Sequence, residues 1–418
     1  MLIEFSVANY RSFLERQTLS MVVGSGRDWR ARHVLETGHR TVPRLLRSAV
    51  VYGPNAAGKS NLVLAMQFFR NFVVSSAKEK QEGEEILITP FKLTKKSARE
   101  PSEFEVVFIE NDNRYQYGFS VNEKRVWHEW LFAVPSGGRT QRWFERSYNP
   151  NTSRYDWYIN PSLKGLRKVW KESTRDNALF LSTAVQLKSE SLREPFDWFQ
   201  NRLRILTSPD RLSNSFSVAK CREEQWKKKI FQFLKAADLG ITDIVVPEKE
   251  LSPEDFSEDF SEEIKKDLLA SKFITALMIH KDEDGDDVAI DLEDESDGTN
   301  VLFSLSFPWL DILENGLVLF VDELHNSLHP HALRFLVDLI HNRERNRHNA
   351  QLIFTAHETS LMSGGFIGRD QIWLVEKDQK QATKLYPLSD FKPRKGEALE
   401  KGYLGGRYGA LPKIKELA

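Results

Sequence analysis

One glycine-rich stretch carries the residue types needed to hold a triphosphate. Residues 53–60 read G-P-N-A-A-G-K-S and fit the pattern G-x-x-x-x-G-K-[ST] of phosphate-binding loops. Glycine lets backbone N–H groups approach an anion closely, and the helix that follows adds its dipole. We expect Lys59 to reach the β- and γ-phosphates and the Ser60 hydroxyl to ligate Mg²⁺. The predicted phosphate contacts are Gly53, Pro54, Asn55, Ala56, Ala57, Gly58, Lys59, Ser60 and Asn61.

A second candidate set is a pair of acids at the end of an apolar run. Residues 316–321 read G-L-V-L-F-V, and Asp322 and Glu323 follow directly. A run this apolar is typical of a parallel strand buried on both faces, so acids at its end need a reason to be there. We expect Asp322 to hold Mg²⁺ through water and Glu323 to orient and deprotonate an attacking water. The alternative is a core strand that merely ends in two acids.

The segments around these residues have the order that such a site requires. Residues 49–52 read as a buried strand before the glycine loop, and apolar residues from Leu62 to Val73 recur at helical spacing after it. A helix over about 331–342 and a buried strand over 351–357 follow the acid pair. His357 ends that strand, and a lone histidine there is more often structural than functional. The pattern predicts an α/β fold.

Composition limits the class of protein. The chain has 418 residues, enough for two or three domains, and a formal net charge of −1. A nucleic-acid surface would therefore have to be a local patch. The single cysteine, Cys221, excludes an internal disulfide framework. No run approaches the roughly 18 apolar residues of a membrane span, and the first residues do not resemble a secretory signal. We expect a cytoplasmic protein without a membrane partner.

The remaining patterns suggest three regions. Strands over 104–109, 115–121 and 127–134 predict an antiparallel meander within a first lobe, residues 1–145. Helical patterns predict an inserted helical lobe over 146–275, which includes a solvated acidic tract at 254–263. A second lobe, 276–418, begins with a hairpin formed by 274–279 and 288–292. Residues 282–287 are acidic, but they lack the spacing of a calcium loop, so we interpret them as the hairpin turn.

Two further short segments carry candidate contacts. Residues 295–299 read E-S-D-G-T before an apolar helix, and Ser296 and Gly298 at a helix N-terminus would form an anion site. Residues 9–13 follow a first strand at 2–7 and read N-Y-R-S-F, a short motif that could belong to a binding site. The alternative interpretation of this stretch is an ordinary first strand and turn.

Taken together, these motifs resemble the ABC-type ATPases of the RecF, SMC and OLD-like branch, most closely RloA-like and abortive-infection ATPases. The resemblance implies ATP and Mg²⁺ as ligands and an ABC-type head with an antiparallel β-subdomain and a helical lobe. It also implies that Asn9 and Arg11 contact the nucleotide, and that His357 is a switch histidine at the γ-phosphate. Ser296 and Gly298 would close over the nucleotide of an opposite subunit, in a homodimer or a higher oligomer.

The biological role divides into two hypotheses. The first is an ATPase that acts as a sensor in anti-phage defence and controls a separately encoded effector, such as a nuclease or a Toprim-like protein. The second is a RecF-like repair ATPase that clamps duplex DNA. No long heptad repeat divides the chain, which argues against an SMC arm. Only about 60 residues follow His357, without the clustered acids of a Toprim nuclease. The missing acid cluster implies an ATPase without its own nuclease. The near-neutral charge, the absence of a coiled-coil arm and the E-S-D-G-T segment, which is similar to a variant in bacterial ATPases of phage-defence operons, favour the defence role.

The last segment of the chain carries its own prediction. Residues 403–412 contain three glycines and end at Pro412, so we expect neither a regular helix nor a central strand there. Its tyrosines and leucines suggest an interaction element between subunits, with Arg407 reaching a neighbour. The alternative is that the segment packs back on its own lobe.

Overall fold

The computed structural model describes residues 1–24, 31–79, 81–237, 239–247, 276–394 and 396–412. These fall into two compact units, which we describe separately. The sheet unit contains Met1–Thr207, Asn315–Leu324 and Val337–Ala418. The helical unit contains Ser208–Glu314 and His325–Leu336. The predicted 146–275 region therefore divides between the two units at residue 207.

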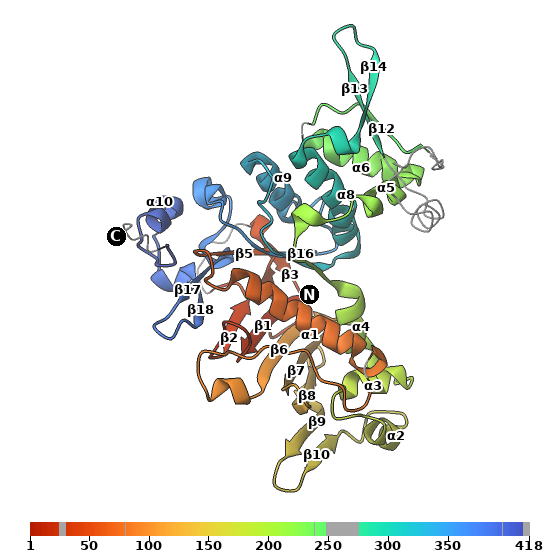
Figure 1. The fold of residues 1–418 in the computed structure, drawn as a ribbon, viewed down its shortest axis with the longest axis vertical. Helices are drawn as coiled ribbons and strands as arrows, with labels where there is room; N and C mark the ends of the chain where they lie inside the picture. The colour runs from red at the N-terminus through yellow and green to blue at the C-terminus, as the bar shows by residue number, and fades with distance from the viewer. Residues whose placement is uncertain (25–30, 80, 238, 248–275, 395, 413–418) are drawn as a thin grey trace, which may run out of the picture. The chain divides into compact units, whose positions relative to one another are not determined.

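A six-stranded sheet in the sheet unit has the order β11-β15-β16-β5-β17-β18. Its strands β16, β5, β17 and β18 are labelled in Figure 1. Its first five strands are parallel, and β18 pairs antiparallel with β17. Every residue of β5, β15 and β16 is buried, as the apolar runs predicted. The strands are β5 Ser48–Tyr52, β11 Leu203–Leu206, β15 Val318–Val321, β16 Gln351–Thr355, β17 Ile372–Lys377 and β18 Thr383–Pro387.

A seven-stranded antiparallel sheet has the order β10-β9-β8-β7-β6-β1-β2. The predicted strands at 104–109, 115–121 and 127–134 are confirmed, but β9 and β10 continue the meander to Ile159, beyond the predicted lobe boundary at residue 145. Arg146 of β9 is fully buried and pairs with buried Glu129 at 2.9 Å, so this part of the chain belongs to the core. The strands are β1 Leu2–Ala8, β2 Gln17–Ser20, β6 Ser102–Glu110, β7 Asn113–Val121, β8 Val126–Val134, β9 Gln141–Asn149 and β10 Arg154–Ile159. The predicted α/β class with an antiparallel subdomain is confirmed.

One core joins the two sheets. Phe69 of α1 (Lys59–Glu79) packs on Phe5 of β1 with ring centroids 6.5 Å apart, and Phe5 lies equally far from Phe320 of β15. Gln351 of β16 hydrogen-bonds the backbone of Leu2 through both its oxygen and its nitrogen. Large apolar side chains buried at such a junction stabilise the sheets as one body. The helix that carries Lys59 is thus held firmly.

Short elements complete the sheet unit. Within the predicted helical lobe, α4 is followed directly by a π-helical turn over Trp198–Arg202, and the chain then enters β11 at Leu203. The described helices and the small sheet are α2 Arg167–Glu172, α3 Phe180–Gln186, α4 Arg193–Asp197, α10 Leu399–Leu404, β3 Val34–Glu36 and β4 Arg44–Leu46.

The helical unit contains the predicted hairpin. Its strands are joined by a turn at Asp282–Asp286 in which Gly285 has a φ of 86°. Residues 274–275 and the acidic tract at 254–263 lie outside the described residues. Helix α9 begins in this unit at Pro330, close to the predicted helix start at about residue 331. The elements are α5 Ser215–Cys221, α6 Glu224–Ala236, β12 Asp243–Val245, β13 Leu277–Lys281, β14 Asp287–Asp291, α8 Asp297–Asn315 and α9 Pro330–His341.

The C-terminal segment packs on its own sheet unit. Its first residues belong to α10, so the expectation that residues 403–412 contain no helix is wrong at Tyr403 and Leu404. Tyr403 and Tyr408 are buried. The Tyr403 hydroxyl donates to the carbonyl of Ala410 at 3.0 Å, and the N–H of Ala410 donates to Glu376 of β17 at 3.1 Å. The glycines allow the chain to turn back, which the composition alone did not reveal.

Among the described residues, no helix is both long and apolar enough to cross a membrane.

Candidate active site

The glycine loop lies between β5 and α1, as predicted, and its glycines are required by packing inside the protein. Gly53 has a φ of 158°, and a Cβ there would lie 2.3 Å from the carbonyl oxygen of Val375. Gly58 has a φ of 115°, and a Cβ there would lie 2.2 Å from the hydroxyl of Thr383. Both strands that border the loop, β17 and β18, therefore press against it. The glycines serve loop packing as well as any approach of phosphate.

A chain of polar side chains fixes the outer side of the loop. The amide of Asn61 donates to the Ser12 hydroxyl at 2.7 Å, and the hydroxyls of Ser12 and Thr383 lie 2.8 Å apart. The Thr383 hydroxyl donates to the carbonyl of Ala57 at 2.7 Å. Through Ser12 and Thr383, the side chain of Asn61 is thus linked to the backbone of the loop. Ser12 lies in the N-Y-R-S-F segment without a predicted role of its own, and Thr383 lies in no predicted motif, because their role depends on the folding that brings them together.

Lys59 is the buried cation of the site. Its side chain lies inside the loop, where Nζ donates to the carbonyls of Gly53 at 2.9 Å and Pro54 at 3.2 Å. Burial lowers the pKa of Lys59, and the negative charges of Glu323 and Asp322 raise it in opposition. The acid pair is therefore close enough to Lys59 to interact with its charge.

The register of the parallel sheet explains why these groups meet. Val321 of β15 pairs with Phe354 of β16, and Thr355 of β16 pairs with Val51 of β5. The three strands therefore end at the same edge, with β16 in the middle. The loop, the acid pair and His357 all follow from these strand ends, which is where α/β sheets carry their ligand sites.

Thr355 holds the acid pair in place. Its hydroxyl donates to Oδ1 of Asp322 at 2.6 Å and accepts from the backbone N–H of Glu323 at 2.8 Å. Its carbonyl accepts from Leu324 at 3.2 Å. Glu323 has a φ of 50°, a left-handed conformation that is uncommon for glutamate and requires such support. No sequence motif contains Thr355, and its role becomes visible only from its position at the end of β16.

His357 lies beside the second acid. Its Nε2 is 3.8 Å from Oε1 of Glu323, and both side chains are about one-third exposed, at 35% and 38%. The two groups are therefore open to a solvent-borne substrate while Asp322 is mostly buried. The sheet edge brings together Lys59, Asp322, Glu323 and His357.

The N-terminal candidates have different surroundings. The amide nitrogen of Asn9 donates to the carbonyls of Ser97 and Glu100, each at 2.8 Å, and its oxygen accepts from Phe91 at 3.2 Å. The side chain of Asn9 thus holds the backbone of residues 91–100, which corrects its expected role as a nucleotide contact. Arg11 is exposed, with Nε donating to the hydroxyl of Tyr10 at 3.2 Å. It precedes Ser12, which borders the loop.

Ser296 and Gly298 belong to the helical unit. As predicted, they lie at the N-terminus of a helix, the 19-residue α8. The Ser296 hydroxyl accepts from the backbone N–H of Thr299 at 3.2 Å and so caps the helix. A Cβ at Gly298 would lie 3.2 Å from the carbonyl of Ser327, which explains the small residue there.

The donor set fits a magnesium ion. Among the described residues, no group of three or more histidine, cysteine, aspartate or glutamate side chains could hold a metal by itself. Mg²⁺ prefers oxygen donors and is commonly held by one or two protein groups together with substrate phosphates. The Ser60 hydroxyl, in the first turn of α1, and the Asp322 carboxylate, directly after β15, are donors of this kind.

A parallel sheet with a phosphate loop and an acid pair at its carboxyl edge defines a P-loop nucleotide-binding ATPase domain. The chain belongs to the family described as "AAA domain, putative AbiEii toxin, Type IV TA system", whose model matches residues 48–363.

Solved structures with a similar fold include the SMC head domain from Thermotoga maritima, at 12% identity and a TM-score of 0.40. That match covers 92% of this chain and 98% of the other. The recombination mediator protein RecF with ATP matches at 15% identity and a TM-score of 0.31, covering 92% of this chain and 97% of the other. No curated protein matches the chain.

Proposed function

We propose that this protein is a Mg²⁺-dependent ATPase of the OLD-like branch, related to RloA-like proteins and acting in the cytoplasm. The observation that carries the proposal is the meeting of Lys59, the acid pair and His357 at one edge of the parallel sheet. A phosphate loop alone would suit any nucleotide binder. Hydrolysis also needs a group that accepts a proton from water, and Glu323, close to the partly exposed His357, is such a group.

Each residue has a role in this proposal. When ATP binds, Nζ of Lys59 donates to phosphate oxygens in place of the two loop carbonyls. The N–H groups of the loop bind the rest of the triphosphate. Ser60 and Asp322 hold Mg²⁺, which supplies positive charge to the phosphates when bound. Glu323 accepts the proton of the attacking water, and His357 contacts the γ-phosphate. Thr355 keeps both acids oriented for these tasks.

Two variants test the proposal. Lys59→Ala should abolish binding of a fluorescent ATP analogue, because the buried cation that pairs with the phosphates is lost. Glu323→Gln should bind the analogue normally but hydrolyse ATP at least about a hundredfold more slowly, because an amide cannot accept the proton. Glu344→Gln, at an exposed position, removes one negative charge elsewhere and serves as the matched control. Wild-type turnover by Glu323→Gln would remove this residue from the role of base.

We further propose that the ATPase is a sensor in anti-phage defence that controls a separately encoded effector. Support comes from the family description, which refers to a toxin and a toxin–antitoxin system, and from the E-S-D-G-T segment at 295–299. Co-expression with the product of a neighbouring gene during phage infection tests this role. Protection should require that gene and should be lost with Lys59→Ala. Salt-dependent duplex DNA binding that stimulates ATP turnover would instead favour the RecF-like role.

A further inference from the structure

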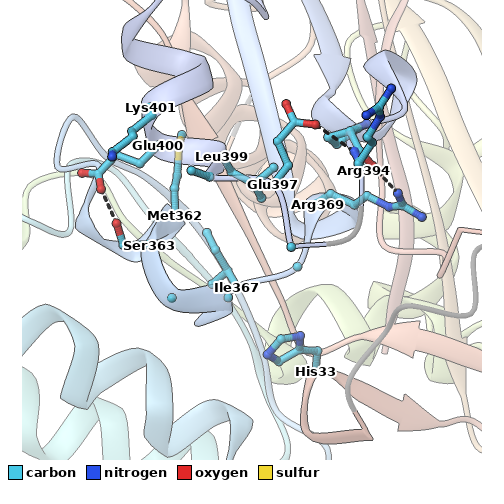
Figure 2. Close-up of a pocket in the computed structure, with 16 residues that line it drawn as sticks. His33, Met362, Ser363, Ile367, Arg369, Arg394, Glu397, Leu399, Glu400 and Lys401 are labelled. Atoms are coloured by element: carbon cyan, nitrogen blue, oxygen red, sulfur yellow. Dashed lines mark hydrogen bonds between the residues drawn. The ribbon is translucent and has the colours of Figure 1, made fainter.

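A cavity in the sheet unit lies outside the candidate active site. It has a volume of about 500 Å³ and opens between residues 362–369 on one side and residues 393–394 and 396–401 on the other (Figure 2). The side chains of Met362, Ile367 and Leu399 lie toward its middle, and charged side chains surround them. Met362 and Ile367 are buried. An apolar floor within a polar rim is the usual anatomy of a surface that receives one side chain of a partner.

Bare backbone forms part of the cavity wall. Gly364 and Gly396 both line it with left-handed φ angles of 64° and 78°. A Cβ added at either position would meet no atom within 4 Å, so the space beside them is open. Packing inside the protein does not require these glycines, in contrast to Gly53 and Gly58. Open backbone of this kind lets the main chain of a bound peptide approach and hydrogen-bond.

The charges of the rim favour an acidic occupant. Glu397 accepts from the hydroxyl of Tyr408 at 2.6 Å and from Arg407, and Glu400 accepts from the hydroxyls of Thr359 and Ser363. Both rim carboxylates are thus satisfied within the protein.

The rim cations are differently placed. Arg369 donates through Nη1 to the carbonyl of Pro393 at 2.7 Å, which fixes its guanidinium at the rim. Arg394 and Lys401 are exposed and make no ion pair within the part of the chain that the structure describes. The ion pair with Arg407 compensates the charge of Glu397, so Arg394 and Lys401 outweigh the one remaining carboxylate, Glu400, and leave the rim attractive to negative charge.

The cavity wall is joined to the candidate active site. Glu400 binds Thr359 at 2.8 Å, and Thr359 lies two residues after His357. Tyr403, one turn further along α10, packs against Tyr52 with ring centroids 6.0 Å apart. Tyr52 is the residue immediately before the phosphate loop. Helix α10 therefore contacts the segment after the switch histidine and the strand that ends in the loop.

We propose that this cavity is the docking site for an acidic segment of a partner protein that inserts one large apolar side chain. We propose also that occupancy is transmitted to the active site through α10. The docking step stands apart from the ATPase activity, whereas the transmission step rests on the proposed function. In the defence role, the docked segment would belong to the effector.

A peptide selection tests the docking step. Random linear peptides displayed on phage are selected on the wild-type protein and depleted on Ala398→Trp, in which an indole covers the cavity mouth. The expected peptides combine aspartate or glutamate with a large apolar residue. Their affinity, measured by fluorescence anisotropy, should fall about tenfold or more in Lys401→Glu, where attraction becomes repulsion.

The controls separate docking from damage to the fold. Lys95→Glu reverses an exposed charge away from the cavity and should leave the affinity unchanged. Each variant must melt like the wild type and bind the ATP analogue. The docking proposal would be overturned if no peptide is enriched over the depleted pool. It would also be overturned if the selected peptides bind Lys401→Glu with the same affinity as the wild type.

A second measurement tests transmission. A selected peptide should change the rate of ATP turnover of the wild type. In Glu400→Gln an amide oxygen replaces the carboxylate, so one of the two hydroxyl bonds is weakened, and the peptide should bind but change turnover less. A bound peptide that leaves turnover unchanged overturns transmission but not docking. Absence of all turnover contradicts the proposed ATPase instead.

Discussion

Thr355 shows how one hydroxyl can organise an acid pair. It satisfies a carboxylate oxygen of Asp322 and the backbone N–H of Glu323 at the same time, at 2.6 Å and 2.8 Å. Removing a hydroxyl from such a site leaves two polar groups without a partner, which costs roughly 1–3 kcal/mol for each buried group. The same hydroxyl also supports the left-handed backbone of Glu323. Thr355 is thus a positioning residue for the proposed hydrolysis.

The residue-scale prediction follows from this geometry. Thr355→Val keeps the shape of the side chain but loses both hydrogen bonds, so ATP turnover should fall at least about tenfold, the equivalent of one such lost bond. Thr355→Ser restores the hydroxyl and should recover most of the rate. Steady-state phosphate release measures this effect, and binding of the ATP analogue should be equal in both variants. Equal loss in the serine and valine variants would show that packing, not the hydroxyl, is required.

The sequence predicted the residues whose chemistry is written into a motif. Lys59, Asp322 and Glu323 lie where the motif order placed them, and the sheet edge brings His357 to them. Thr355 could not be found in this way, because its role depends on pairing between β15 and β16. Asn9 illustrates the opposite case, since a matching letter in a short motif does not reveal that its amide is already bonded to the backbone.

At the scale of elements, the apolar runs were reliable and the short strands were not. β5, β15 and β16 were predicted because continuous burial leaves a continuous apolar run. β11 was not predicted, since four residues are too few to show a period. The boundary at residue 145 was misplaced for a related reason: polar residues alternate through β9 and β10, whose faces are only partly buried.

A buried histidine on α9 gives a prediction on pH. His341 is fully buried, and its Nε2 lies 2.8 Å from the Ser48 hydroxyl and 3.1 Å from the Gln371 amide. Burial, with the nearby charges of His33, Arg32 and Arg47, holds the pKa of His341 well below its usual value.

In the unfolded chain the His341 side chain therefore takes up a proton near pH 6.5, whereas in the folded protein this side chain stays neutral at that pH. The contribution of His341 to the free energy of unfolding is fully present above that pH. Below it, this contribution declines by about 1.4 kcal/mol per pH unit. The melting temperature should fall between about pH 7.5 and pH 5.5, and less so in His341→Gln. An equal fall in both proteins would assign the effect to other groups.

The C-terminal segment supports a second prediction at this scale. Tyr403 packs on Tyr52, and Tyr408 is also buried, so deleting residues 401–418 exposes both contact surfaces. Loss of two buried aromatic side chains costs about 3 kcal/mol or more. The truncated protein should melt well below the wild type. Arg407→Ala removes only an exposed ion pair with Glu397 and should change the melting temperature little. A truncated protein that melts normally would return the segment to the role of a free interaction element.

For the whole molecule, the separation of the helical unit from the phosphate loop along the chain suggests assembly. Ser296 and Gly298 form a capped N-terminus on α8, where exposed backbone N–H groups favour an anion. We expect ATP to favour a head-to-tail dimer in which this N-terminus contacts the phosphates bound by Lys59 of the other subunit. Such an arrangement would make each active site depend on both chains.

Sedimentation velocity of Glu323→Gln, with and without ATP, measures this dimer. ATP should shift the protein to a faster-sedimenting species, and adding Lys59→Ala should prevent the shift. Ser296→Asp is the sharper variant, because aspartate still caps α8 but places a negative charge against the incoming phosphates. It should leave the melting temperature unchanged while raising the ATP concentration needed for dimerisation about tenfold or more. Ser296→Ala, which loses the cap without adding charge, separates the two effects. If both Ser296 variants dimerise like the parent protein, or if ATP leaves the parent a monomer, the head-to-tail arrangement is wrong.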